Sequence, residues 1–189
     1  MRETFSAEYM VLQAELHATG HYGVMGRQYG NIVLKLLDVC NATTLLDYGC
    51  GSKRSLLMGL TLPDHVQYEG YDPAVPAYST RPQPADLVVC IDVLEHIEPQ
   101  FLDNVLDDLA DLCNPYGFFT VHTGPAVKFL RDGRNAHLIQ QGKEFWCNAF
   151  DDRFEILEIE ETGSGFMVFV VVRNKQADAD NRIDGAPHS

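Results

Sequence analysis

The chain contains no run of about 18 apolar residues, so the sequence predicts no membrane-spanning helix. Its first residues do not show the charged and then apolar pattern of a secretion signal. The five cysteines are scattered, and no two of them form a C-x-x-C pair, which argues against a disulfide framework. Together these absences predict a reduced protein of the cytoplasm.

Basic residues are also scarce. The sequence has 14 Lys and Arg against 27 Asp and Glu, which gives a formal net charge of −13. A protein that binds DNA or RNA needs a basic surface, because phosphate contacts supply most of the non-specific affinity. A polynucleotide partner is therefore disfavoured, although a local basic patch at the entrance of a site would still allow one nucleotide to bind. The acids of the helix expected at residues 100–113 are interpreted as a solvated face.

What the chain does contain is an alternation of apolar strands and amphipathic helices over 189 residues, 46% of them hydrophobic. That length favours one domain, which we assign to residues 1–174, because the polar residues 175–189 lack periodicity and predict a disordered tail. Helices are expected at residues 3–19, 32–40, 54–60, 100–113 and 143–150. Strands are expected at residues 43–48, 66–71, 87–92, 118–122, 154–161 and 166–173, with a turn at 114–117.

The most informative segment is a strand that ends in Asp47 and then turns through Gly49 and Gly51. Glycine at these two positions allows φ above zero and leaves no Cβ between the backbone and a ligand. An adenosine-type ligand can then lie against the end of the strand, beside backbone N–H groups. Cys50, between the two glycines, is interpreted as a small residue packed in this turn.

A second acid, Asp72, ends the next strand, about 20 residues beyond the glycine turn. An acid in that place can accept hydrogen bonds from both hydroxyl groups of a ribose. The same geometry occurs in nicotinamide dinucleotide sites, whose fingerprint is G-x-G-x-x-G. Arg54 occupies the third glycine position here, which disfavours a dinucleotide.

Residues 85–99 form a third motif, a wholly apolar strand followed by D-V-L-E-H-I. Together with D-Y-G-C-G at the glycine turn, this segment resembles class I S-adenosylmethionine (SAM)-dependent methyltransferases of the small single-domain type. The resemblance implies an α/β fold with a Rossmann-like sheet, mostly parallel, that ends in an antiparallel C-terminal hairpin. It also implies SAM as the cofactor, held by residues of the three motifs: Asp47, Gly49, Cys50, Gly51, Asp72 and Asp92.

The sequence departs from that family between residues 73 and 84. Four prolines in this segment forbid a helix of useful length, whereas the family has a helix, a third strand and another helix there. We therefore expect a sheet trimmed of the usual third strand and its flanking helix. Asp86 is a weak substitute for the acid that the missing strand would present to the adenine amino group.

Transfer of a methyl group needs alignment of the acceptor with the methyl and removal of one proton. Residues 130–138 are polar and contain a glycine, so this loop is expected to lie over the substrate. Within it, His137 has a suitable pKa to act as the base. Glu95 and His96 in the third motif, and His122 at the end of the next strand, are the other candidates near the acceptor.

Residues 20–30 form a further candidate segment, since four glycines in eleven residues give the backbone unusual freedom. In similar methyltransferases, the segment before the first helix often closes over the cofactor. This resemblance adds His21, Tyr22 and Arg27 as candidate site residues, against the alternative of an ordinary surface loop.

Asp92, Glu95 and His96, followed later by a histidine, also resemble the E-x-x-E-H…H metal site of small-RNA 2′-O-methyltransferases. Carboxylates suit Mg²⁺, whereas imidazoles prefer softer metals. The same L-E-H sequence occurs in members of the class that need no metal, where it organises the start of a helix. We therefore assign no metal ligand and keep a divalent cation as the alternative.

The sequence thus predicts a SAM-dependent methyltransferase that acts on a small molecule or a modified nucleotide by direct transfer to O or N. One alternative is a SAM-binding protein without transfer activity, which the trimmed sheet favours. The other is a nicotinamide-dependent reductase, which Arg54 and the terminal hairpin disfavour. The sequence carries no signal for the oligomeric state.

Overall fold

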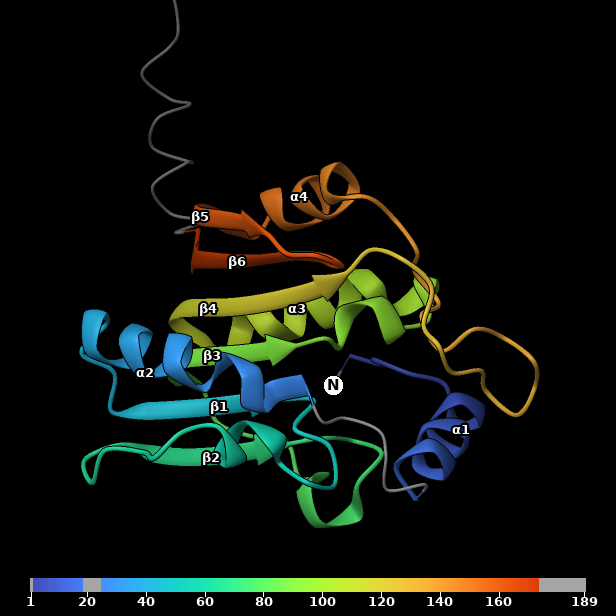
Figure 1. Cartoon of the computed structure of the whole chain (residues 1–189), viewed down its shortest axis with the longest axis horizontal. Helices are drawn as coiled ribbons and strands as arrows, with labels where there is room; N and C mark the ends of the chain where they lie inside the picture. Colours follow the sequence, from blue (N-terminus) through green and yellow to red (C-terminus); the bar gives the residue numbers. More distant parts are fainter. Residues whose placement is uncertain (1, 19–24, 174–189) are drawn as a thin grey trace, which may run out of the picture.

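The computed structural model describes residues 2–18 and 25–173, so the predicted tail at 175–189 lies outside the described residues. The chain forms one six-stranded sheet in the order β2-β1-β3-β4-β6-β5 (Figure 1). Pairing is parallel from β2 to β4 and antiparallel for β4 with β6 and for β6 with β5, as the sequence predicts. The strands are β1 (Thr44–Tyr48), β2 (Gln67–Tyr71), β3 (Ala85–Ile91), β4 (Cys113–His122), β5 (Phe154–Glu161) and β6 (Gly165–Val172).

Helices cover both faces of this sheet, with α2 on one face and α3 and α4 on the other (Figure 1). Helix α1 lies apart from these layers, beyond the carboxyl ends of the parallel strands. In the part of the chain that the structure describes, no helix is long and apolar enough to cross a membrane. The α-helices are α1 (Ala7–Ala18), α2 (Gly30–Val39), α3 (Leu102–Leu112) and α4 (Lys143–Asp151). Short 3₁₀ turns are η1 (Met25–Tyr29), η2 (Ser55–Met58), η3 (Pro76–Tyr78), η4 (Leu94–His96) and η5 (Pro99–Phe101).

Strand β3 shows why the sheet is covered on both faces. Successive side chains of a strand point to opposite faces, so a strand with no polar face must be buried on both sides. Leu87 and Val89 pack with α2 in one core cluster, and Val88 and Cys90 pack with α3 and α4 in the other. Each fully buried aliphatic side chain contributes about 1.5–3 kcal/mol, so β3 holds both helical layers to the sheet.

The segment between β2 and β3 contains no strand and only the short turn η3. Strand β2 is therefore an edge of the sheet, and the predicted loss of the usual third strand and its flanking helix is confirmed. Asp86 does not replace the missing acid. Its carboxylate accepts hydrogen bonds from the Thr43 and Thr44 N–H groups at the amino ends of the strands, so it lies at the sheet edge opposite the ligand end.

The turn that the sequence predicts at residues 114–117 is wrong, because strand β4 already begins at Cys113. Cys113 pairs with Ala85, and Tyr116 pairs with Leu87, with a register shift between the two pairs. Strand β4 therefore advances one residue more than β3 over this interval, which is the pattern of a β-bulge. Turn-forming residues here distort a strand and do not end one.

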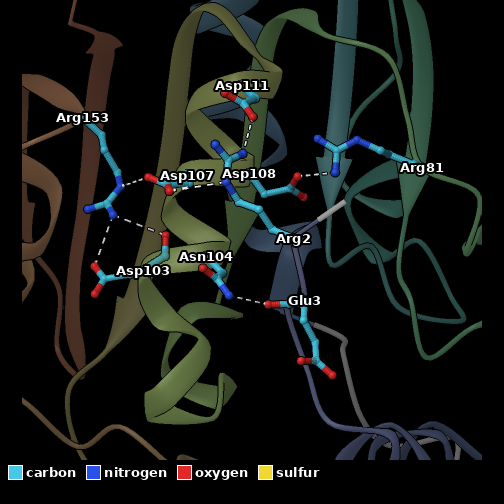
Figure 2. Close-up of polar contacts among 9 residues, drawn as sticks. All are labelled: Arg2, Glu3, Arg81, Asp103, Asn104, Asp107, Asp108, Asp111 and Arg153. Atoms are coloured by element: carbon cyan, nitrogen blue, oxygen red, sulfur yellow. Dashed lines mark hydrogen bonds and ion pairs between the residues drawn. The ribbon is translucent and has the colours of Figure 1, made fainter.

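The acids of α3 do more than form a solvated face (Figure 2). Asp108 is 2% exposed, accepts a hydrogen bond from the Tyr48 hydroxyl at 3.2 Å and pairs with Arg81. The other acids pair with arginines from two further segments: Arg153 with Asp103 and Asp107, and Arg2 with Asp107 and Asp111. Three segments that are distant in the sequence are thus attached to one helix, which corrects the sequence-based interpretation.

Candidate active site

A cavity of about 500 Å³ lies at the carboxyl ends of the parallel strands. Its walls come from the ends of β1, β2 and β3, from helix α1, and from the loop between β4 and α4 (Figure 1). Gly51 and Arg27 are not on its wall, and His21 and Tyr22 lie outside the described residues. The other predicted site residues line it: Asp47, Gly49, Cys50, Asp72, Asp92, Glu95, His96, His122 and His137.

The glycine turn has the backbone form that the sequence predicts, with φ of +79° at Gly49 and +64° at Gly51. A Cβ on Gly49 would lie 2.4 Å from a methyl carbon of Val93, so a side chain there would displace the loop after β3. The Gly49 N–H donates to the Tyr71 carbonyl at 2.7 Å, and the Gly51 N–H donates to Asp72 Oδ2 at 3.0 Å. Gly51 therefore acts by orienting Asp72, since it does not itself reach the cavity.

Asp72 is 6% exposed, and backbone groups fix both of its carboxylate oxygens. Oδ1 accepts the Ala74 N–H at 2.9 Å, and Oδ2 accepts the Gly51 N–H. Each oxygen has a further lone pair, so the oriented carboxylate can still accept two hydroxyl hydrogen bonds. Burial raises the pKa of Asp72, and the neighbouring His17 opposes this rise.

Asp47 lies at the end of β1 and is 4% exposed. It accepts a hydrogen bond from the Tyr68 hydroxyl at 2.9 Å. Burial raises the pKa of Asp47 to about 7, although the Tyr68 hydrogen bond favours the charged form. A cationic ligand group beside this carboxylate would stabilise its charged form.

Asp92 follows β3 in the left-handed region, with φ of +51°, which is uncommon for a residue other than glycine. The Thr120 hydroxyl donates to its carboxylate at 2.6 Å, and the Asp92 N–H donates to the Thr120 hydroxyl oxygen at 2.9 Å. These contacts stabilise a strained backbone conformation at the cavity wall. Such strain is often found at functional positions.

Glu95, His96 and His137 converge at the other side of the cavity. Each offers one ligand-type atom, and these atoms all lie within 4.8 Å of one another. Glu95 is completely buried, and its Oε1 accepts the His122 N–H at 3.0 Å. Its Oε2 has no hydrogen-bond partner among the described residues. Burial, and then the charge of Asp92, raise the pKa of Glu95 well above its ordinary value.

Hydrogen bonds assign the tautomers of three of the histidines that line the cavity, His96, His122 and His137. His96 Nδ1 lies 2.7 Å from the Ala136 carbonyl and His137 Nδ1 lies 2.7 Å from the Gly124 carbonyl. A carbonyl only accepts, so both Nδ1 atoms carry the proton and both Nε2 atoms carry the lone pair. His122 is the reverse, because its Nδ1 accepts the Gly124 N–H at 3.2 Å.

Burial favours the neutral form of both imidazoles of the converging pair. Burial and the neighbouring His137 lower the pKa of His96 to about 3. Burial also lowers the pKa of His137, and the Gly124 hydrogen bond offsets part of that change. A neutral imidazole with its lone pair on Nε2 can accept a proton or ligate a cation.

Helix α1 supplies the part of the site that the sequence did not predict. Tyr9, Gln13 and His17 line the cavity from one face of this helix. The Tyr9 hydroxyl donates to the His96 carbonyl, and the Gln13 amide donates to Tyr9. Their spacing of four residues is a signal of a shared helix face, but such spacing does not by itself show whether that face lines a site or packs in the core.

The sheet order, the glycine turn and the acid after β2 define a class I methyltransferase fold. The chain matches the family described as a methyltransferase domain over residues 23–158. The chain therefore belongs to this methyltransferase family, and the class that its motifs predict is confirmed. No curated protein matches the sequence.

Solved methyltransferases share the fold. The 1,6-didemethyltoxoflavin-N1-methyltransferase of Burkholderia thailandensis has 13% identity and a TM-score of 0.63, over 93% of this chain and 94% of that one. The N-methyltransferase NodS of Bradyrhizobium japonicum has 15% identity and a TM-score of 0.52, over 78% of this chain and 95% of that one. The small RNA methyltransferase HEN1 has 17% identity and a TM-score of 0.57, over 78% of this chain and 25% of that one. At these identities the likeness establishes the fold alone.

Proposed function

We propose that the protein transfers the methyl group of SAM to an oxygen or nitrogen of a small molecule or a modified nucleotide. The observation that carries this proposal is the Glu95–His96–His137 cluster, which lines the same cavity as the glycine turn and Asp72. One cavity thus offers a nucleotide-type site and, across from it, groups that can take a proton from an acceptor.

The cofactor end of the cavity suits SAM in chemistry and in position. Asp72 is oriented to accept hydrogen bonds from the ribose hydroxyls. Asp47 offers a buried carboxylate to the cationic end of SAM. Gly49, Cys50 and Asp92 form the adjoining wall. Gly51 acts through Asp72.

The transfer itself is a direct displacement. A lone pair of the acceptor attacks the methyl carbon, the carbon–sulfur bond breaks, and its electrons return to sulfur. The acceptor also loses a proton, and His137 takes it in this proposal, because the ring is neutral and its Nε2 carries the lone pair. His96 and Glu95 hold the neighbouring positions of the cluster.

A cation-assisted version of the same reaction is favoured by one specific observation, the buried Glu95 Oε2 without a hydrogen-bond partner among the described residues. Glu95, His96 and His137 fit a divalent cation, and both histidines donate Nδ1–H to a carbonyl, as metal-ligating histidines commonly do. When bound, such a cation would supply a Lewis acid that lowers the pKa of an acceptor hydroxyl.

A small acceptor is preferred over a polynucleotide. The net charge of −13 opposes association with a long polyanion. The B. thailandensis relative in fold is named for methylation of 1,6-didemethyltoxoflavin at N1, whereas HEN1 is named for small RNA. The acidic charge of this chain favours the first kind of acceptor.

The test is transfer of isotopically labelled methyl from SAM to three separate pools: small metabolites, modified nucleosides and nucleotides, and total RNA. We expect label in the first or second pool, and mass spectrometry of the product then distinguishes O- from N-methylation. The variant Asp72→Ala is the matched control for transfer that does not depend on the cofactor site. Label confined to RNA, or binding of SAM with no transfer to any pool, would contradict the proposal.

A further inference from the structure

The backbone of Gly124 makes hydrogen bonds with two histidines that line the cavity, His122 at the end of β4 and His137 in the loop before α4. The Gly124 N–H donates to His122 Nδ1 at 3.2 Å, and the Gly124 carbonyl accepts from His137 Nδ1–H at 2.7 Å. The two rings are neighbours, with their centroids 4.8 Å apart. One residue thus holds two adjacent imidazoles in opposite tautomers, with a proton on His122 Nε2 and a lone pair on His137 Nε2.

The Nε2 atoms of both rings can reach a ligand. The side-chain hydrogen bonds of His122 and His137 are made through Nδ1, and neither Nε2 has a hydrogen-bond partner among the described residues. Neither Nε2 is one of the buried polar atoms that lack a partner in the described part of the chain, so both are accessible from outside the protein. Since the two rings line the cavity, its wall presents an N–H donor beside a lone-pair acceptor.

We propose that His122 is an acceptor-binding residue and that, with His137, it selects an acceptor whose methylated N–H or O–H is conjugated to a neighbouring carbonyl group. Lactams and enolised ketones are acceptors of this class. The inference rests on the proposed function, in which His137 takes the proton, and it narrows the class of acceptor. The sequence places His122 only near the acceptor, and nothing in the motifs or in the family match assigns it a role.

The two rings match the charges that develop during transfer to such an acceptor. When its N–H or O–H gives the proton to His137 Nε2, the electron pair left behind is shared with the neighbouring carbonyl oxygen. His122 Nε2–H donates to that oxygen and stabilises its negative charge. The acceptor atom then attacks the methyl carbon of SAM, the carbon–sulfur bond breaks and its electrons return to sulfur. His122 keeps its proton throughout.

An acceptor without the neighbouring carbonyl would satisfy only one ring. It would displace water from His122 Nε2–H and offer no hydrogen bond in return, which costs binding free energy. A site built to make a hydrogen bond discriminates against an analogue that lacks the partner group. The His122–His137 pair therefore selects against an isolated hydroxyl or amine.

The test uses the whole chain in complex with S-adenosylhomocysteine and two isomeric probes, 2-pyridone and 4-pyridone. The N–H of 2-pyridone is next to its carbonyl, whereas 4-pyridone carries the same two groups on opposite sides of the ring. Nitrogen NMR of the histidine rings reports the tautomers of His122 and His137, and titration with each probe gives its affinity.

Three variants accompany wild type. His122→Phe removes the N–H donor, and His122→Gln keeps a side-chain N–H in its place. Phe129 lies in the same loop as His137, is 63% exposed and does not line the cavity, so Phe129→Ala is the matched control.

Without a probe, we expect the NMR signals to show the proton on Nε2 of His122 and on Nδ1 of His137. In wild type, 2-pyridone should bind about three- to tenfold more tightly than 4-pyridone, because only 2-pyridone can make hydrogen bonds with both rings at once. His122→Phe should remove this preference, His122→Gln should keep part of it, and Phe129→Ala should leave it unchanged.

Three results would overturn the inference. They are the same tautomer on both rings, 2-pyridone that binds wild type no more tightly than 4-pyridone, or an undiminished preference in folded His122→Phe. The first two measurements need no variant, so they decide the question even if His122→Phe does not fold. Wild type that binds no S-adenosylhomocysteine would refute the proposed function as well, whereas S-adenosylhomocysteine binding with equal affinities for the two probes refutes this inference alone.

Discussion

The imidazole rings of His96 and His137 meet edge to face, with their centroids 4.7 Å apart. His96 comes from the turn after β3, and His137 comes from the loop between β4 and α4. The Nδ1–H of His96 donates to the carbonyl of Ala136, the residue directly before His137. The two histidines are therefore positioned as one unit, because the hydrogen bond from His96 holds the loop that carries His137.

We expect His137→Ala to lower turnover about 10²- to 10⁴-fold while the affinity for SAM stays unchanged. The reason is that we place His137 on the acceptor side of the cavity, where it converges with Glu95 and His96, and assign Asp72 and the glycine turn to the cofactor. The measurement is methyl transfer at saturating SAM, with calorimetric SAM binding as the control. A loss of SAM affinity equal to the loss of turnover would show a structural role for His137.

A chelator distinguishes the two versions of the chemistry in wild-type protein. If His137 acts as a base without a cation, turnover should resist the chelator. If Glu95, His96 and His137 hold a divalent cation, the chelator should abolish turnover and added divalent metal should restore it. In that case Glu95→Gln should weaken metal binding, because it removes the only carboxylate of the three groups.

Asp72→Ala should lower the affinity for SAM at least about tenfold, because charge-assisted hydrogen bonds to hydroxyls contribute roughly 1.5–3 kcal/mol each. The matched control is Glu69→Ala, which removes the same charge from an exposed position of β2, the strand directly before Asp72. Calorimetry of both folded variants is the measurement. Unchanged SAM binding in Asp72→Ala would remove Asp72 from the cofactor site.

Local chemistry explains why much of the fold and the cofactor end were predictable. The apolar run of β3 requires burial on both faces, and the prolines of residues 73–84 forbid a helix longer than a turn. Gly49 and Gly51 have the positive φ that their position in a tight turn requires. Asp72 lies at the cavity because the carboxyl ends of parallel strands share one edge.

Other features depended on contacts between distant segments. His17 reaches the site only because α1 crosses the carboxyl ends of the strands, which no local pattern specifies. Asp108 is charged, and the amphipathic pattern of α3 predicts that its side chain is exposed. In the fold it is buried, hydrogen-bonded to Tyr48 and paired with Arg81. Residues 114–117 have the composition of a turn, but pairing with β3 keeps them within a strand.

The difference in stability between Asp47→Asn and wild type should depend on pH, because Asp47 titrates in wild type and asparagine does not. Folding raises the pKa of Asp47 to about 7. Between about pH 4 and pH 7 the Asp47 side chain is therefore protonated in the folded protein and deprotonated in the unfolded chain. The contribution of Asp47 to stability therefore falls as pH rises through this window. Asparagine does not titrate, and its side-chain oxygen can still accept the Tyr68 hydrogen bond.

Relative to wild type, Asp47→Asn should thus gain stability as pH rises from 4 to 7, by on the order of 2–4 kcal/mol. Urea unfolding at several pH values without SAM measures this difference. Exposed Asp38→Asn is the control and should keep the pH profile of wild type. A pH-independent difference between Asp47→Asn and wild type would mean that Asp47 is already charged in the folded protein at low pH.

The ion pair between Arg81 and Asp108 should be the most costly contact of the α3 network to break. Asp108 is 2% exposed, so among the described residues Arg81→Met leaves this buried carboxylate with only the Tyr48 hydroxyl as a partner. Removal of one partner of a buried pair costs about 3–5 kcal/mol, and the partial exposure of Arg81 reduces this to about 1–3 kcal/mol. The melting temperature should then fall by roughly 2–12 °C for a chain of this size.

Arg2→Met is the matched control, since Arg2 makes the same kind of contact with α3 from an exposed position and should leave the melting temperature nearly unchanged. A second substitution separates loss of charge from loss of packing. If the cost of Arg81→Met is the uncompensated charge of Asp108, then Asp108→Asn should destabilise the Arg81→Met protein less than it destabilises wild type, or even restore stability. Additive effects of the two substitutions in thermal unfolding would show that Arg81 and Asp108 contribute independently and that the buried pair is not energetically coupled.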